Sequence, residues 1–287
     1  HHFMNQLRYL SLVSEKQFRG DMPAMHRTRR TGSGIEFAGH RDYVPGDDLR
    51  YLDWNVYARL GRRQLRLFDE EEDLYVYILM DCSLSMSVGK PIKSDYAKKV
   101  AAALACIALS GMDRVSIMTF SDRIHDVFPP ARGQNHLPAV LRFLCQCQCR
   151  NSVTDLTGSV RDFLRKQPRP GLVILISDFF DPDGFESGLD LLRYERSEPE
   201  VVQIFDRTEQ RPEFSGDCQI TDIETNVTTH IVADESALAG YRLRFERFLD
   251  AMRKYCVRHG CGCTISSTEV PPEELVLQRM RKTGRVR

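Results

Sequence analysis

Asp81, Ser83 and Ser85 occupy alternate positions directly after an apolar segment, and all three carry oxygen atoms of the kind that bind hard cations. The preceding residues 74–80 read Leu-Tyr-Val-Tyr-Ile-Leu-Met, which has the length and the β-branched and aromatic content of a buried parallel strand. Loops after such strands lie at the carboxyl edge of an α/β sheet, where ligands bind. One carboxylate and two hydroxyls at this spacing can converge on a single divalent cation. The same residue types are also common in plain turns, so the motif needs support from elsewhere in the chain.

Two more oxygen-bearing residues follow in similar positions downstream. Thr154 precedes a helix-like stretch over 156–167, and Asp178 ends a second apolar strand that begins near residue 171. Oxygen ligands suit Mg²⁺ first, and also Mn²⁺ or Ca²⁺. We therefore predict a divalent-cation site made of five residues, namely Asp81, Ser83, Ser85, Thr154 and Asp178.

The elements that must position these residues alternate regularly from residue 74 onward. Apolar segments of strand length are followed by segments of helix length, which predicts an α/β fold with a doubly wound, mostly parallel sheet flanked by helices. The expected strands are 74–80, 114–120, 124–128, 172–177, 200–205 and 262–266, with a hairpin over 219–231. The expected helices are 94–110, 137–147, 156–166, 184–192 and 235–259.

A strand followed by Asp-x-Ser-x-Ser, then a loop threonine, then a strand ending in Ser-Asp resembles the metal-ion-dependent adhesion site of von Willebrand factor A domains. The resemblance covers roughly residues 72–267. It implies a Rossmann-type sheet in which the first and fourth strands lie side by side, where the winding of the chain reverses. It also implies that the hydroxyls of Ser83, Ser85 and Thr154 approach the metal, whereas Asp81 and Asp178 act largely through water.

A charged block over residues 26–71 precedes the first of these strands. Its segments resemble the signature of the domain of unknown function 58 family, which are von Willebrand factor A-like bacterial proteins: Gly32-Ser-Gly-Ile-Glu36-Phe37, Arg41-Asp-Tyr43-Val-Pro-Gly46-Asp47, Arg50-Tyr-Leu-Asp53-Trp54 and Ala58-Arg59. Later segments are similar to that family as well, namely Asp206-x-x-Glu209, Gly216-Asp217, Asp222-x-Glu224-Thr225 and a helix with Tyr241, Cys256 and Gly260. Cys82 and Val153 depart from the family pattern. Members often occur beside MoxR-type AAA+ ATPases, so the resemblance implies such an ATPase as a partner.

These patterns divide the chain into four parts. A tag remnant and helical lead-in (1–25) is followed by the charged block (26–71), a von Willebrand factor A-like domain (72–280) and a basic tail (281–287). The charged residues of the block either fasten it to the domain through ion pairs or present a surface to a partner, and both interpretations stay open. They are Arg41, Asp47, Asp48, Arg50, Asp53 and Arg59.

The charged block is expected to pack on the following domain as an extension of it. Apolar side chains suited to that packing are Phe37, Tyr43, Leu52, Trp54 and Leu67. Limited proteolysis is therefore expected to leave the block attached, with any cleavage confined to residues 32–34. Rapid cutting throughout 26–71 that leaves a stable 72–287 core would contradict the packing.

Composition narrows the remaining classes of protein. Lys+Arg and Asp+Glu both total 40 of the 287 residues, so no overall field favours nucleic acid or an anionic membrane. No apolar run approaches the ~20 residues of a membrane span, and no secretory signal follows Met4, so we expect a cytoplasmic protein.

An odd number of cysteines, nine, fits reduced thiols. Two cysteine clusters lack zinc-finger spacing and are more typical of ordinary thiols than of a thiolate metal site: Cys145, Cys147, Cys149 and Cys256, Cys261, Cys263.

A binding role fits the predicted site better than catalysis. A phosphatase of the haloacid dehalogenase type needs a second aspartate two residues after its nucleophile, where this chain has Ser83. No histidine lies in the three site loops to activate a serine. Neutral hydroxyls leave a divalent cation under-neutralised with one face open, and an Asp or Glu carboxylate of a partner protein would complete its coordination. The sequence therefore predicts a non-catalytic, metal-dependent adaptor, and the family resemblance implies a chaperone-like or complex-assembly role with a MoxR-type AAA+ ATPase. The alternative is a metal-dependent phosphatase-like hydrolase.

Overall fold

The computed structural model describes residues 36–69, 74–150, 152–214, 216–224 and 227–279. These residues fall into two compact units, one within Gln17–Asp73 and one within Leu74–Arg287. The predicted helical lead-in and the basic tail lie outside the described residues.

The N-terminal unit is built on a two-stranded antiparallel sheet. Strand β1 (Glu36–Asp42) pairs with β2 (Gln64–Asp69). Between them lie a 3-10 turn η1 (Leu49–Tyr51) and a short helix α2 (Trp54–Leu60). The helix begins after Asp53, whose carboxylate accepts hydrogen bonds from the first backbone N–H groups of α2.

Two ion pairs in this unit join residues that are close in sequence. Arg41 pairs with Asp47 at 2.6 Å, and Arg50 pairs with Asp48 at 2.6 Å, so both pairs close turns within the unit. Trp54 is 59% exposed and meets only the edge of a neighbouring tyrosine ring, so it is not part of the unit's own core. Its role as an anchor against the following domain stays a prediction.

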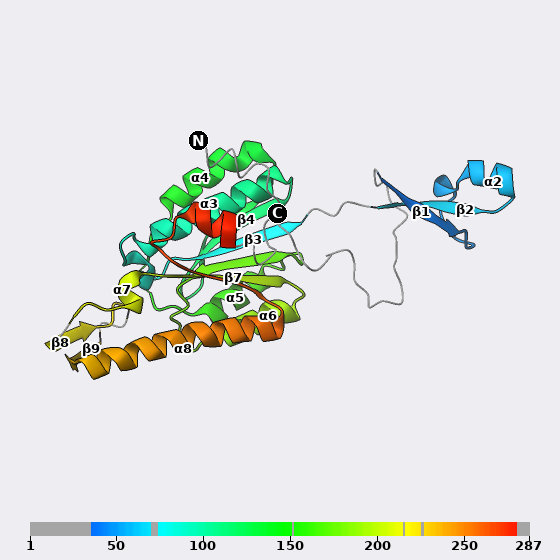
Figure 1. The fold of residues 1–287 in the computed structure, drawn as a ribbon. Helices are drawn as coiled ribbons and strands as arrows, with labels where there is room; N and C mark the ends of the chain where they lie inside the picture. Colours follow the sequence, from blue (N-terminus) through cyan, green and yellow to red (C-terminus); the bar gives the residue numbers. More distant parts are fainter. Residues whose placement is uncertain (1–35, 70–73, 151, 215, 225–226, 280–287) are drawn as a thin grey trace. The chain divides into compact units, whose positions relative to one another are not determined.

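The second unit contains a six-stranded sheet in the order β10-β7-β6-β3-β4-β5. Neighbouring strands are parallel except for β5, which runs antiparallel to β4, so the predicted mostly parallel α/β fold is confirmed. Figure 1 shows the sheet between two layers of helices. The strands are β3 (Tyr75–Asp81), β4 (Arg114–Phe120), β5 (Ile124–Arg132), β6 (Leu172–Ser177), β7 (Glu198–Phe205) and β10 (Gly262–Ser267).

The first and fourth strands of this unit, β3 and β6, are direct neighbours, as the sequence predicts. Gly171 permits this arrangement, because a Cβ atom there would lie 2.3 Å from the carbonyl oxygen of Tyr75 on β3. Both strands end at the same edge of the sheet. Residues from two distant parts of the chain therefore meet there.

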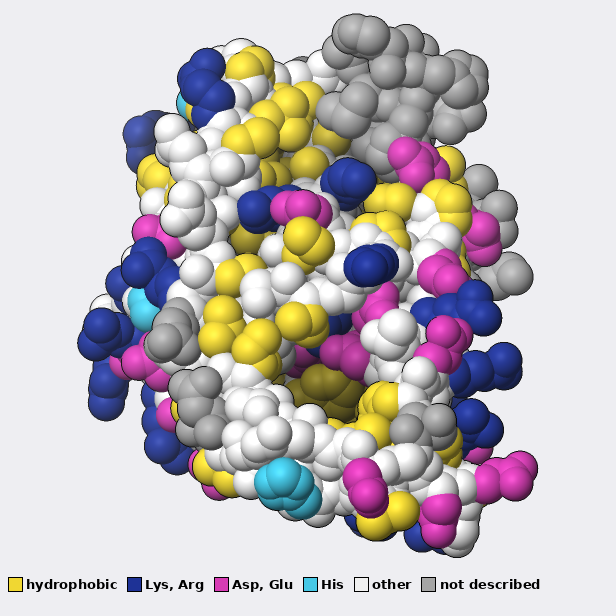
Figure 2. Space-filling model, turned by 90° about the vertical axis from the view of Figure 1, so that its left-hand side faces the viewer, with side chains coloured by type: hydrophobic (Ala, Val, Ile, Leu, Met, Phe, Trp, Pro, Cys, Tyr) yellow, Lys and Arg dark blue, Asp and Glu magenta, His cyan; other side chains and the backbone are white. Residues whose placement is uncertain are grey.

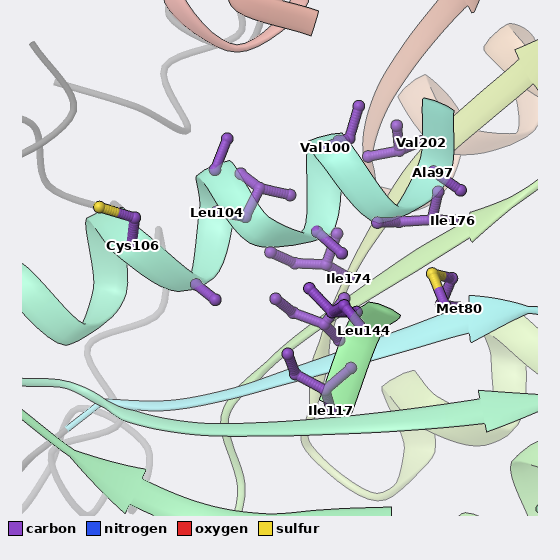
Figure 3. Packing of buried hydrophobic residues seen from close by; sticks show 14 of the residues in the cluster. Met80, Ala97, Val100, Leu104, Cys106, Ile117, Leu144, Ile174, Ile176 and Val202 are labelled. Atoms are coloured by element: carbon purple, nitrogen blue, oxygen red, sulfur yellow. The ribbon is translucent and has the colours of Figure 1, made fainter. Parts of the chain in front are cut away.

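Alternate side chains of β3 enter two separate cores, as expected for a strand buried on both faces. Ile78 and Met80 belong to the core on the face that α3 covers. Figure 3 shows Val100 and Leu104 of α3 above Ile174 of β6 in that core. Helices α3 and α4 cover this face, while α5, α6 and α8 cover the other (Figure 1). The helices are α3 (Lys93–Ser110), α4 (Leu137–Gln146), α5 (Leu156–Arg165), α6 (Glu186–Tyr194), α7 (Arg207–Gln210), α8 (Glu235–His259) and α9 (Pro272–Glu274).

The predicted hairpin is present and slightly longer than expected. It consists of β8 (Gly216–Thr221) and β9 (Thr228–Ala233), whose side chains are mostly exposed. Figure 1 places it beyond the ends of the sheet strands, near the start of α8. The remaining turns are η2 (Leu84–Ser87) and η3 (Gln134–His136), with a π-helical turn η4 (Leu275–Arg279) after α9.

Candidate metal centre

The five predicted site residues lie at the carboxyl edge of the sheet. Asp81 ends β3, Asp178 follows the end of β6, and Thr154 lies in the loop before α5. Asp81 and Asp178 are fully buried, and Ser83 and Thr154 are also buried, whereas Ser85 is half-buried. The Oγ atoms of Ser83 and Ser85 are 2.9 Å apart.

Two hydrogen bonds hold the carboxylate of Asp81 in a fixed orientation. Oδ1 accepts from the backbone N–H of Ser83 at 2.8 Å, and Oδ2 accepts from the hydroxyl of Ser177 at 2.5 Å. Ser177 is the last residue of β6, so this contact ties the ends of β3 and β6 together. Sequence reasoning missed Ser177 as a site residue, although it stands directly before Asp178.

The pKa of Asp81 is raised to about 7, first by burial and then by the nearby carboxylate of Asp178. A buried carboxylate beside another one favours its neutral form unless positive charge is supplied. No Lys, Arg or His among the described residues forms an ion pair with Asp81. Within the described part of the chain, the carboxylate at the end of β3 therefore lacks a counter-ion.

Lys93, at the start of α3, is a fully buried partner of Asp178 that the sequence did not reveal. Its Nζ donates to Oδ2 of Asp178 at 2.7 Å and also to Oε1 of Glu209. Burial acts to lower the pKa of Lys93, but the two carboxylates outweigh it and hold that pKa above its ordinary value. The lysine is charged, and it fixes the position of Asp178.

Glu209 is positioned by a capping box at the start of α7. Its second oxygen, Oε2, accepts from the backbone N–H of Asp206 at 2.7 Å, while Oδ1 of Asp206 accepts from the N–H of Thr208. The hydroxyl of Tyr241 on α8 donates to the carbonyl oxygen of Glu209 at 2.7 Å. The Asp206-x-x-Glu209 segment thus positions a carboxylate on Lys93, next to the predicted site.

A fourth carboxylate, that of Glu224, reaches the site from the turn of the β8–β9 hairpin. Its Oε1 accepts from the hydroxyl of Thr154 at 3.1 Å and from the backbone N–H of Ser85 at 3.3 Å. Its Oε2 accepts from the backbone N–H of Thr154 at 3.1 Å. Sequence reasoning noted Asp222-x-Glu224 only as part of a family resemblance and did not place it at the site.

The oxygen atoms present fit a hard divalent cation. In an octahedral Mg²⁺ site with bonds of about 2.0–2.1 Å, neighbouring ligand oxygens are about 2.9 Å apart. The hydrogen-bonded Ser83–Ser85 pair at 2.9 Å matches this spacing, and the hydrogen-bonded Thr154–Glu224 pair at 3.1 Å is slightly wider. Of the four carboxylates at this centre, only those of Asp178 and Glu209 pair with the ammonium group of Lys93, so within the described residues the centre is short of positive charge.

Ligands other than carboxylates must take part in any such site. In the described part of the chain, no three His, Cys, Asp or Glu side chains lie together as a metal-binding group. All nine cysteines are free thiols. The hydroxyls of Ser83, Ser85 and Thr154 are therefore the groups through which a cation would be held.

The carboxyl edge of the sheet is accessible from outside. Figure 2 shows this face hollowed near its middle, above the hairpin, with acidic, basic and apolar side chains in the hollow. Ser85 and Glu224 are both half-buried, so the site reaches the surface on their side. A partner group can approach from that direction.

Comparison with known proteins gives one family and several similar chains. The profile of the family described as "Protein of unknown function DUF58" matches residues 39–255. Uncharacterized proteins of Mycobacterium bovis and Mycobacterium tuberculosis are 27% identical over 267 residues, which cover 91% of this chain and 83% of theirs.

Several solved structures are similar to this chain at low sequence identity. The conserved hypothetical protein BatB from Bacteroides thetaiotaomicron has a TM-score of 0.45 and 13% identity, covering 74% of this chain and 98% of that chain. An aerotolerance-related membrane protein from Bacteroides fragilis has a TM-score of 0.43 and 15% identity, covering 73% and 99%. Among the described residues of the present chain, no helix has the length and apolar character needed to cross a membrane.

Proposed function

This chain belongs to the DUF58 family of proteins of unknown function, and we propose that it is a non-catalytic adaptor that docks a partner carboxylate on a bound divalent cation. The observation that carries the proposal is the excess of carboxylates over cationic side chains among the described residues of this centre, beside three hydroxyl groups of which two, those of Ser83 and Ser85, lie 2.9 Å apart. A divalent cation bound there would supply positive charge both to these carboxylates and to an incoming Asp or Glu.

The residues of the chain have separate tasks in this proposal. The hydroxyls of Ser83, Ser85 and Thr154 hold Mg²⁺, Mn²⁺ or Ca²⁺, and Asp81 and Asp178 neutralise it from the buried side. Ser177 and Lys93 orient the two aspartates. Because these supports sit on strand and helix ends, the site is rigid before a partner arrives.

The proposed partner is a protein with an exposed Asp or Glu, and a MoxR-type AAA+ ATPase is the partner class that the family resemblance favours. The proposed role is chaperone-like or in the assembly of a complex. A catalytic role has less support, because Ser83 and Ser85 hydrogen-bond to each other and no histidine of the described residues contacts either hydroxyl. The adaptor is proposed to act in the cytoplasm.

Metal titration tests the first step of the proposal. Isothermal titration of the metal-free protein with Mn²⁺ or Mg²⁺ is expected to show one site, which Asp81→Asn weakens by about 10–100-fold, as loss of an outer-shell partner does. Asp183→Asn, an exposed carboxylate on the loop after β6, is the matched control and should leave the affinity unchanged. Equal affinity in the wild type, Asp81→Asn and Ser85→Ala would contradict the assignment.

A further inference from the structure

The carboxylate of Glu224 lies against two residues of the candidate metal centre. It accepts hydrogen bonds from two backbone N–H groups and one hydroxyl, and these donors belong to Ser85 and Thr154 of the candidate metal centre. Glu224 is separated from them by 139 and 70 positions in the sequence. This contact therefore brings a carboxylate from a distant part of the chain onto the accessible side of the site.

The carboxylate of Glu224 is half-buried against Ser85 and Thr154. Among the residues that the structure describes, no Lys, Arg or His forms an ion pair with it. A half-buried carboxylate held only by neutral donors gains more from a nearby divalent cation than a solvated one does. Its position and its missing counter-charge both favour a role as a ligand.

The hairpin that carries Glu224 is attached to the rest of the unit by few buried groups. Of its strand side chains only Ala233 is buried, and Ile220 and Val232 are exposed apolar side chains. A single two-stranded hairpin is marginally stable without such support. The three hydrogen bonds of Glu224 are thus a main tie between the hairpin tip and the sheet, and they can be exchanged for others at modest cost.

We propose that Glu224 is an internal carboxylate ligand that closes the candidate metal centre, and that a partner carboxylate must displace it and its hairpin to dock. This proposal rests on the proposed function. The exchange replaces one carboxylate by another at the same cation, so the net charge at the site is unchanged. Because Glu224 competes with the partner carboxylate, the hairpin lowers the affinity for the partner without abolishing it. The same arrangement discriminates against free carboxylates such as acetate. Glu224 is tethered to the chain, so only a partner protein that makes further contacts can displace it.

Mn²⁺ used as the probe gives the first readout. Water-proton relaxation of the Mn²⁺-loaded full chain is expected to report about one more exchangeable bound water in Glu224→Ala than in the wild type, because one ligand position opens. Acetate is expected to remove that extra water in Glu224→Ala at concentrations that leave the wild type unchanged. Asp217→Asn, an exposed carboxylate on the same hairpin, is the matched control and should behave as the wild type.

Hydrogen exchange over residues 216–233 gives a second readout. Mn²⁺ is expected to slow the exchange of the backbone amide hydrogens of the hairpin in the wild type but not in Glu224→Ala. The variant Glu224→Gln removes the charge and keeps a hydrogen-bond acceptor, so it separates these two contributions. The contrary result is Mn²⁺ binding that depends on Asp81 while the number of waters on Mn²⁺ and the hydrogen-exchange rate of the hairpin are the same in the wild type and in Glu224→Ala. That result overturns the role of Glu224 as a ligand and leaves the adaptor proposal standing. If the wild type binds no Mn²⁺, both proposals fall.

Discussion

Replacing Lys93 by methionine is expected to lower the free energy of unfolding by about 3–5 kcal/mol, the range observed when one partner of a buried ion pair is removed. The side chain is fully buried and pairs with both Asp178 and Glu209, so its loss leaves one fully buried and one partly buried carboxylate without a counter-charge. Methionine has similar length and keeps most of the packing against neighbouring apolar groups. The cost therefore comes from charge more than from lost volume.

Urea denaturation of the metal-free protein measures this effect. Lys98→Met, on the same helix, is the matched control, because Lys98 forms only a partly exposed pair with Asp95 and should cost less than 1 kcal/mol. The double variant Lys93→Met with Asp178→Asn should recover part of the loss, since it removes one of the stranded charges. A Lys93→Met protein as stable as Lys98→Met would show that Lys93 does not hold the carboxyl edge together.

The sheet was predictable because its strands are apolar runs bounded by polar turns. The segments that became β3 and β6 are buried on both faces, and burial on both faces is what makes a sequence read as continuous Val, Ile and Leu. The weaker elements escaped prediction for the opposite reason. Strand β1 carries a glycine and several charges in seven residues, and α2 is too short to show a helical period.

The core of the candidate site was predictable, whereas its surroundings were not. Asp81, Ser83 and Ser85 are close in sequence, so their convergence follows from one loop. Lys93 looks like an ordinary solvent-facing residue at a helix start, because nothing in Pro-Ile-Lys-Ser indicates that the side chain will be covered. Glu224 lies in a polar hairpin turn, and only the folded structure shows which loop that turn reaches. The Asp-x-x-Glu pattern at 206–209 is typical of a helix capping box, but the sequence does not show that Glu209 contacts Lys93.

Removing the cation is expected to weaken capture of the partner far more than it weakens the fold. A charged group left buried and unpaired in an interface costs about 2–5 kcal/mol, which corresponds to roughly 30- to several-thousand-fold in affinity. EDTA should therefore abolish co-purification of a partner such as the cognate MoxR-type ATPase, and added Mg²⁺ should restore it. Ser85→Ala should act in the same direction, because it removes a proposed ligand without stranding a buried charge, whereas Asp178→Asn also disturbs Lys93.

The control for partner capture is Asp183→Asn, which is exposed on the same edge and should co-purify the partner as the wild type does. Circular dichroism of each variant separates a lost ligand from a lost fold. A complex that is indifferent to EDTA, to Ser85→Ala and to Asp81→Asn would remove the cation from the mechanism and leave the hollow face as an ordinary polar interface. Metal-dependent hydrolysis of a phosphate ester by the purified chain, lost in Asp81→Asn, would instead favour catalysis. Turnover requires a nucleophile or a water molecule that the site activates, and docking of a carboxylate does not.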